Sequence, residues 1–286
     1  MLHWLPAPTK ALLRSRYRGW RSSYVRWRKG FSTQDFVQAL AGAGIERGDV
    51  VLVHSGMTGF EGFRGTAMEI IAVLKETVGL SGMLIMPTLS MTGSAIEIAE
   101  SGKVFDPRTT PSKVGLITEL FRRTEGVSRS VHPTHSVAAW GTGAAGFVAN
   151  HHLAATPCGR GTPFHRLLER GGKVLLAGVG IEAMTFYHCA EDLLEDRLPV
   201  SPFTRETFVL KCRVNGTILD TAPMRLYDPE VSHRRRLDPL AAELHARGLW
   251  REARTGSLTL TALRAADVVV ALEAMAGRGV FCYLPA

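Results

Sequence analysis

Short apolar segments alternate with amphipathic segments of helical length along this 286-residue chain, and this alternation constrains its fold more than any other feature. The clearest apolar segment is Lys173–Val179 (KVLLAGV), and Asp49–His54 and Met83–Met86 have the same character. Thr66–Val78 and Gly115–Arg123 show helical spacing instead. The pattern predicts an α/β fold in which helices cover both faces of a sheet.

The C-terminal third departs from this alternation. Asn215-Gly216 lies between the segments Phe208–Val214 and Thr217–Asp220, and Asn-Gly is typical of a type I′ hairpin turn. Two further helices and a last strand are expected at Pro239–Arg247, Leu263–Gly277 and Val280–Leu284. We therefore predict a three-layer α/β/α sandwich around a mixed, largely parallel sheet, with a C-terminal β-hairpin.

Binding sites of α/β sheets usually lie in loops at the ends of the strands. The loops that follow His54, Met86, Trp140 and Val179 are therefore the candidates here. Histidine and hydroxyl side chains are concentrated near these strand ends, most densely in Arg129–Ser136 (RSVHPTHS), just before a strand expected to begin at residue 137. We expect a polar site at this edge of the sheet.

The net charge of +8 is confined to the N-terminal end of the chain. Eight of the 34 Lys and Arg residues precede residue 35, where there is no acid, and the remaining 26 bases match the 26 acids. We therefore divide the chain into a basic aromatic arm (1–34) and a single α/β domain (35–286). A nucleic-acid partner is not expected, because the basic residues are not spread over the domain.

Five aromatic side chains accompany the basic residues of the arm. This composition suits peripheral contact of residues 1–31 with an anionic membrane or a carrier. The alternative is a solvated helix whose aromatic side chains pack on the domain. The aromatic residues are Trp4, Tyr17, Trp20, Tyr24 and Trp27.

The four cysteines are far apart in the sequence and form no C-x-x-C pair, so we expect them to be reduced and the protein to be cytoplasmic. No apolar run is long enough for a membrane-spanning helix, and arginines interrupt the first twenty residues where a signal peptide would be apolar. The cysteines are Cys158, Cys189, Cys212 and Cys282.

Thr185, His188 and Glu191 are spaced i, i+3 and i+6 in a segment of predicted helix, so their side chains are expected close to one face. A carboxylate one turn from an imidazole raises its basicity and fixes its tautomer, as a general base requires. The alternative is an exposed polar face or a histidine near a helix end.

Other chemistries receive weaker support from the sequence. His132 and His135 form an H-x-x-H pair, so a metal-dependent hydrolase that uses them with His188 remains an alternative, although H-E-x-x-H is absent. A G-x-S-x-G nucleophile motif is also absent. The serines of the candidate loops, with nearby Lys and Arg side chains, are better suited to binding phosphate groups.

Several of these segments together, in this order, resemble the aminoglycoside 3-N-acetyltransferase family. The similarity covers about residues 33–285 and is strongest over 50–195. The matching stretches are Val53-His54-Ser55, Gly82–Thr88, Phe105-Asp106-Pro107, Thr110-Pro111-Ser112, Gly115–Arg122, Arg129–Ala139, Val174–Val179, and Thr185 with His188 and Glu191.

The resemblance implies an α/β/α enzyme that transfers acetyl from acetyl-CoA to a primary amine of an aminoglycoside or amino sugar, without a metal. It implies His188 as general base and Glu191 as its carboxylate partner, and we assign Thr185 as a donor to the oxyanion. The implied coenzyme cradle is Ser55, Thr88, Ser112, Arg129, Ser130 and Ser136, to which we add His54, Lys113 and His132.

The identity of the amine acceptor stays open between two classes. A polycationic aminoglycoside requires an acidic cleft, which Glu61, Asp106 and Asp192 are predicted to supply. The basic run 234–236 suits an anionic acceptor instead. The alternative function is therefore a biosynthetic N-acyltransferase acting on a nucleotide-linked, polysaccharide or natural-product amino sugar.

Overall fold

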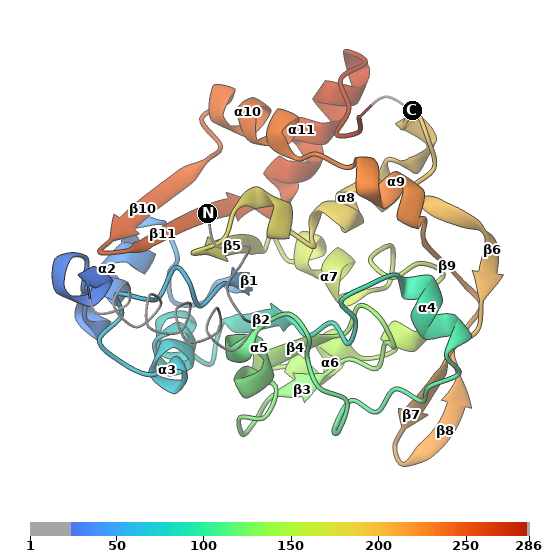
Figure 1. Cartoon of the computed structure of the whole chain (residues 1–286), viewed down its shortest axis with the longest axis horizontal. Coiled ribbons are helices and arrows are strands. Elements are labelled where there is room, and N and C mark those ends of the chain that lie inside the picture. Colours follow the sequence, from blue (N-terminus) through green and yellow to red (C-terminus); the bar gives the residue numbers. More distant parts are fainter. Residues whose placement is uncertain (1–23, 285–286) are drawn as a thin grey trace, which may run out of the picture.

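The computed structural model describes residues 24–284 and contains a seven-stranded mixed sheet flanked by helices (Figure 1). The central strands β5, β1 and β2 are parallel, whereas the pairs toward both edges are antiparallel. This arrangement confirms the predicted mixed α/β sheet. In spatial order the strands are β10 (Arg251–Thr255), β11 (Leu258–Arg264), β5 (Lys173–Ala177), β1 (Val50–Ser55), β2 (Met83–Pro87), β4 (Val137–Gly141) and β3 (Ser128–Arg129).

Successive residues of the central strands alternate between two hydrophobic cores. Val51 and Val53 of β1 face one core, whereas Leu52 faces the other. The first core is completed by α2 (Thr33–Gly42), α3 (Ala67–Val78) and α5 (Leu116–Phe121). The second core is completed by α6 (Ala144–Val148), α7 (Pro163–Glu169), α8 (Tyr187–Leu193), α10 (Asp238–Ala246) and α11 (Ala265–Gly277). The three-layer α/β/α sandwich is thus confirmed.

Local sequence signals explain where the first helices begin. Ser32 and Asp35 form a capping box at the start of α2, and Thr66 and Glu69 do so at the start of α3. Each box satisfies backbone N–H groups that lack a partner in the first turn of a helix. Helix α3 therefore begins where the segment Thr66–Val78 predicts it, and both helices pack in the core that Val51 and Val53 of β1 face.

The predicted Asn215-Gly216 hairpin is present as β7 (Lys211–Val214) and β8 (Thr217–Asp220). Both turn residues have positive φ, 49° and 87°, as a type I′ turn requires. Strand β6 (Phe203–Phe208), which precedes this hairpin, pairs with β9 (Met224–Tyr227), which follows it. The short helical elements elsewhere in the chain are α4 (Ala95–Glu100), α9 (Pro229–Arg234), η1 (His151–Leu153), η2 (Ile181–Ala183) and η3 (Glu195–Arg197).

Two expectations for the C-terminal end are wrong. Leu263 belongs to β11, the second strand of an antiparallel β10–β11 hairpin, rather than to the helix that follows. Val280–Leu284 forms no strand; within it, Tyr283 makes a single bridge to Arg235. An apolar pattern of five residues does not reveal whether a segment has a strand to pair with.

The direction of β4 corrects one candidate loop. Because β4 is antiparallel to β2, Val137 lies beside Pro87 and Gly141 beside Met83. The loop after Trp140 therefore lies at the end of the sheet where β2 begins, opposite to the carboxyl ends of β1, β2 and β5. The segment 130–136, which precedes β4, lies at those carboxyl ends instead, so the polar residues of this segment join the candidate site.

Two features bear on where the protein resides. Among residues 24–284, no helix combines the length and apolar character needed to cross a bilayer. All four cysteines are buried and unpaired. Trp4, Tyr17 and Trp20 of the predicted arm lie outside the described residues, while Trp27 is exposed and carries the guanidinium of Arg28 over its ring.

Candidate active site

A cavity of about 510 Å³ is lined by residues of α4, α8, β9 and α9 and of the segment that precedes β4. The rings of His135, His188 and Tyr227 line it, together with the guanidinium-bearing Arg235. The remaining lining residues are Leu89, Met91, Thr92, Gly93, Ser94, Ala95, Glu97, Pro229, Ser232 and His233. Of the predicted catalytic residues, His188 therefore faces a space large enough for a small-molecule acceptor.

His188 and Glu191 form a hydrogen-bonded pair in α8, as their i, i+3 spacing predicts. Nδ1 of His188 lies 2.9 Å from Oε2 of Glu191, whose side chain has no exposed surface. Glu191 also accepts hydrogen bonds from Arg235 Nη2, at 3.3 Å to each oxygen, and from the Tyr283 hydroxyl. The ring of Tyr227 lies against that of His188, with centroids 4.2 Å apart. These contacts hold both members of the pair.

The surroundings keep the imidazole neutral and the carboxylate charged. Burial lowers the pKa of His188, and the charge of Arg235 lowers it further, while Glu191 opposes both. Burial acts to raise the pKa of Glu191, but His188, Arg235 and Tyr283 together lower it. Since the carboxylate can only accept, His188 donates from Nδ1, and its Nε2 lone pair, with no partner among residues 24–284, is available to the cavity.

Thr185 does not share a regular helix with this pair. Helix α8 begins at Tyr187, and the carbonyl of Thr185 accepts from the backbone N–H of His188 at 3.1 Å. Thr185 does not line the cavity in front of His188. Its assignment as an oxyanion donor stays a prediction that the spacing alone supports.

Arg129, Thr88 and Ser136 of the predicted cofactor cradle form a buried network. Nε of Arg129 lies 3.0 Å from Thr88 Oγ1 and 3.2 Å from Ser136 Oγ, and its Nη2 donates to Thr88 O at 2.6 Å. Thr88 and Ser136 are fully buried. Burial, followed by the charge of Arg122, lowers the pKa of Arg129 to about 9. In this structure the three side chains bind one another and hold the loop after β2 against β3 and β4.

Two more cradle residues, Ser130 and His132, are also buried in contacts with the protein. Ser130 Oγ lies 2.9 Å from both His151 Nδ1 and the backbone nitrogen of Val137. Nδ1 of His132 accepts from the backbone N–H of His135 at 3.0 Å. These side chains are therefore placed to support the segment 130–136 rather than to face the cavity.

Of the remaining predicted cofactor residues, His54 and Ser55 have polar atoms without a protein partner. His54 Nε2 and Ser55 Oγ, at the carboxyl end of β1, are buried without a hydrogen-bond partner. Burial lowers the pKa of His54 to about 3. Lys113 is exposed, whereas Ser112 Oγ lies 3.0 Å from the hydroxyl of Thr118. Buried polar atoms without protein partners fit a site that a polar ligand completes.

The three acidic residues predicted for the acceptor do not line this cavity. Glu61 borders separate hollows near β1, and Asp106 pairs with Arg213 at 3.2 Å. Asp192 lies one turn after His188 in α8, where burial raises its pKa although Thr156 donates to it. Among the described residues, the one carboxylate that lines the cavity is Glu97 of α4, a residue that no sequence motif distinguishes.

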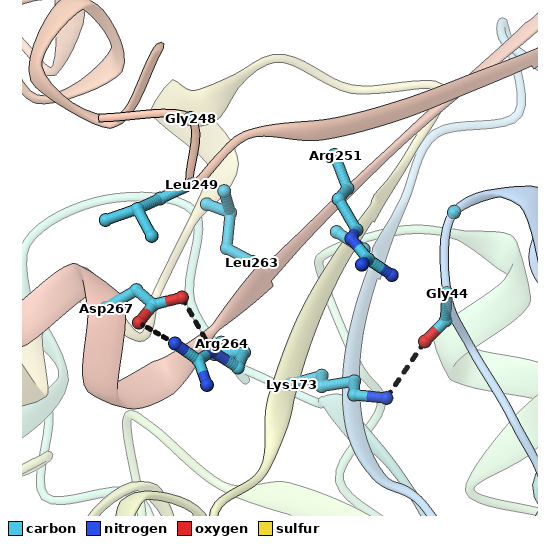
Figure 2. Close-up of a pocket in the computed structure, with 10 residues that line it drawn as sticks. Gly44, Lys173, Gly248, Leu249, Arg251, Leu263, Arg264 and Asp267 are labelled. Carbon is cyan, nitrogen blue, oxygen red and sulfur yellow. Dashed lines mark hydrogen bonds and ion pairs between the residues drawn. The ribbon is translucent and has the colours of Figure 1, made fainter. Parts of the chain in front are cut away.

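Another cavity, of about 340 Å³, lies at the opposite end of the sheet, where β5 begins at Lys173 (Figure 2). Lys173 donates there to Gly44 O at 2.9 Å and to Asp49 at 2.7 Å. Arg264 pairs with Asp267 at 2.7 Å. None of the predicted site residues lines this cavity, so we place the active site at the cavity of His188.

Metal chemistry receives no support from the described part of the chain, in which no three His, Cys, Asp or Glu side chains are grouped as metal ligands. Of the three histidines of the alternative hydrolase, His132 uses Nδ1 to accept from the backbone N–H of His135, whereas its Nε2 has no hydrogen-bond partner.

Comparisons with known proteins agree with this geometry. A sequence model of the aminoglycoside 3-N-acetyltransferase family matches residues 52–276. The chain is 30% identical over 174 residues to the SPbeta prophage-derived aminoglycoside N(3′)-acetyltransferase-like protein YokD of Bacillus subtilis (strain 168), covering 55% of this chain and 64% of that protein. It is 32% identical over 171 residues to aminoglycoside N(3)-acetyltransferase IX of Micromonospora chalcea, covering 55% and 60%.

The chain thus matches less than two thirds of the length of these curated relatives. Among solved structures, aminoglycoside acetyltransferase AAC(3)-Xa superposes with a TM-score of 0.77 at 25% identity, over 88% of this chain and 95% of that one. The fold is therefore shared over most of the chain.

Proposed function

Because the chain belongs to the aminoglycoside 3-N-acetyltransferase family, we propose that it transfers an acetyl group from acetyl-CoA to a primary amine of an aminoglycoside or another amino sugar. One observation carries the proposal. His188 presents Nε2 to a cavity of about 510 Å³ while its Nδ1 is held by the buried carboxylate of Glu191. An imidazole so oriented is suited to accept a proton from a bound amine.

His188 would act as the general base of this reaction. The amine nitrogen attacks the thioester carbonyl carbon and its proton moves to Nε2. The C–S bond then breaks, and the departing thiolate takes the proton back from Nε2, so that coenzyme A is released as the thiol and His188 is again neutral. A lowered pKa of His188 keeps Nε2 unprotonated before the attack. Glu191 then stabilises the imidazolium that forms, as the buried carboxylate of a Ser-His-Asp triad does.

The coenzyme would bind at the carboxyl end of β1 and at the loop before α5. The unpartnered His54 Nε2 and Ser55 Oγ provide polar groups there, and the exposed Lys113 provides a cation for a phosphate. The buried network of Arg129, Thr88 and Ser136 would support these loops from behind.

One observation favours the second candidate function, acetylation of a nucleotide-linked, polysaccharide or natural-product amino sugar in biosynthesis. The cavity in front of His188 is lined by a single carboxylate, Glu97, and by the cationic Arg235. A polycationic antibiotic requires several carboxylates to replace the water around its ammonium groups. A lining with one carboxylate favours an acceptor with few positive charges.

We also propose that the protein is cytoplasmic and that its N-terminal arm contacts a membrane or a carrier. Buried, unpaired cysteines support a cytoplasmic protein. The exposed Trp27, with Arg28 over its ring, supports contact of residues 1–31 with an anionic membrane or carrier. We keep residues 35–286 as one α/β domain.

The experiment that tests the function is thiol release from acetyl-CoA in the presence of two amine panels. One panel holds polycationic aminoglycosides, and the other holds monoamino sugars, free and nucleotide-linked. Thiol release that depends on the amine supports acetyl transfer, and the panel with the higher kcat/KM identifies the acceptor class. Absence of amine-dependent release with both panels contradicts the proposal.

A further inference from the structure

A second imidazole, that of His135, faces the cavity beside the proposed base. Its ring centroid lies 6.0 Å from that of His188, with the two planes at 84°, and 5.3 Å from that of Tyr227. His135 is 3% exposed and lines the cavity, and Thr134 Oγ1 lies 2.9 Å from its Nδ1. The proposed reaction above assigns no role to its Nε2.

Local hydrogen bonds determine which nitrogen of His135 carries the proton. Nδ1 of His132 accepts from the backbone N–H of His135 at 3.0 Å and from that of Thr134 at 3.3 Å. The lone pair of His132 Nδ1 is therefore already used. Thr134 Oγ1 lies 3.3 Å from this nitrogen but 2.9 Å from Nδ1 of His135, and we assign its hydroxyl as the donor in the shorter contact.

Because Nδ1 of His135 accepts a hydrogen bond, the single proton of its neutral ring is on Nε2. Burial lowers the pKa of His135 well below its ordinary value, and the charges of His188, His151 and Arg235 lower it further, so the ring stays neutral. His135 and His188 thus hold opposite tautomers. His188 offers a lone pair to the cavity, and His135 offers an N–H.

We infer that the Nε2–H of His135 stabilises the oxyanion that forms when the amine attacks the thioester carbonyl. This inference rests on the proposed acetyl transfer. As the nitrogen–carbon bond forms, the carbonyl π electrons move to oxygen; the oxyanion then expels the thiolate and the C=O bond re-forms. His135 keeps its proton throughout, while His188 takes the proton of the amine.

The position of His135 suits this role better than that of the other candidate donor. A fixed N–H of a neutral group, inside a partly enclosed cavity, is the kind of donor that stabilises developing negative charge most strongly. Thr185, the donor expected from the sequence, does not line the cavity. His135 faces the same space as His188, and its orientation is fixed by Thr134.

Steady-state kinetics of three variants tests the inference. His135→Leu removes the donor, and kcat is expected to fall by about 10²-fold or more, with little change in the KM for the amine. His135→Gln retains an N–H donor of similar reach and is expected to recover part of the loss. Thr134→Val removes the group that fixes the tautomer, so a smaller fall in kcat is expected.

A matched control is Thr221→Val, which removes another buried threonine hydroxyl. This hydroxyl accepts a hydrogen bond of 3.0 Å from Leu210 N, and Thr221 does not line the cavity. Its kcat is expected to be unchanged. If His135→Leu keeps the wild-type kcat, or raises only the KM for the amine, the oxyanion role is overturned.

Nitrogen-15 NMR of the wild-type imidazoles provides a readout that does not depend on turnover. For His135 we expect a protonated Nε2 and an unprotonated Nδ1 at pH 7 to 8, the reverse of His188. An active wild-type enzyme with the opposite His135 tautomer contradicts the inference alone. A wild-type enzyme that acetylates neither amine panel contradicts the proposed function itself.

Discussion

The hydroxyl of Tyr283, close to the C-terminus, donates to Oε1 of Glu191, a residue 92 positions earlier in the chain. Backbone hydrogen bonds hold the C-terminal segment in place, from Arg236 N to Cys282 O and from Leu284 N to Arg234 O. Arg235, between these contacts, reaches the same carboxylate. The partner of the proposed base is therefore held by two segments distant from it in sequence, and Arg235 provides the first test.

Replacing Arg235 with Met is expected to shift the acid limb of the kcat/KM profile to higher pH. The guanidinium lowers the pKa of His188, so its removal raises that pKa, and the neutral base is then lost at a higher pH. The measurement is a pH–rate profile on one amine. Arg236→Met, on an exposed neighbouring side chain, serves as the control and is expected to leave the limb in place.

Glu97→Gln tests the charge of the acceptor. Glu97 is the one carboxylate on the cavity lining, so its neutralisation is expected to lower kcat/KM for a polycationic aminoglycoside by about tenfold, and less for a monoamino sugar. Glu243→Gln, on α10 and paired with arginines away from the cavity, is the matched control. Equal effects of Glu97→Gln on both amines contradict an electrostatic role.

The buried histidines predict a loss of stability in acid. Burial lowers the pKa of His54 and of His151 to about 3, well below their ordinary value of 6.5. Between about pH 6.5 and 3 these two rings are protonated in the unfolded chain but neutral in the folded protein. The free energy of unfolding therefore decreases as the pH falls.

The His54→Leu variant is expected to reduce the steepness of this decrease by about 1.4 kcal/mol per pH unit, the contribution of one proton. Urea unfolding at several pH values between 4 and 6 measures it. His245→Leu, on the exposed side of α10, is the control. A slope identical in His54→Leu and wild type contradicts the buried, neutral state of this ring.

Gly178 and Gly59 bring together the loops that follow β5 and β1. Gly178 has a φ of 69°, and a Cβ there would lie 2.7 Å from the Cα of Gly59. Gly178→Ala is expected to cost about 1–3 kcal/mol of unfolding free energy, from strain and from overpacking. Gly180→Ala, where a Cβ meets no atom within 4 Å, should leave thermal unfolding unchanged. Equal melting temperatures for both variants contradict the close approach.

Much of the fold follows from local patterns, because strands such as Lys173–Ala177 are buried on both faces and therefore read as continuous apolar runs. The Asn215-Gly216 turn is equally local, since both residues adopt the positive φ that the turn requires. The direction of β4 depends on its pairing with β2, and the bridge at Tyr283 depends on Arg235. Both partners are far away in the chain, so no local sequence pattern predicts these contacts.

The candidate site divides in the same way. The His188–Glu191 pair lies within one helical turn, so its spacing predicts it. The roles of Tyr283 and Glu97 depend on tertiary contacts, and the sequence offers no signal for them. The tautomer of His135 depends on the contact between its Nδ1 and the Thr134 hydroxyl, and on the backbone N–H of His135 occupying the Nδ1 lone pair of His132. A sequence motif does not reveal these contacts.

The role of His188 as general base is tested most directly by the kcat for acetyl transfer of His188→Ala at saturating amine and acetyl-CoA. His245→Ala, away from the cavity on α10, is the matched control, and circular dichroism establishes that both variants are folded. We expect kcat to fall by about 10²- to 10⁴-fold in His188→Ala and to be unchanged in the control. A folded His188→Ala enzyme with the kcat of the wild type would contradict this role.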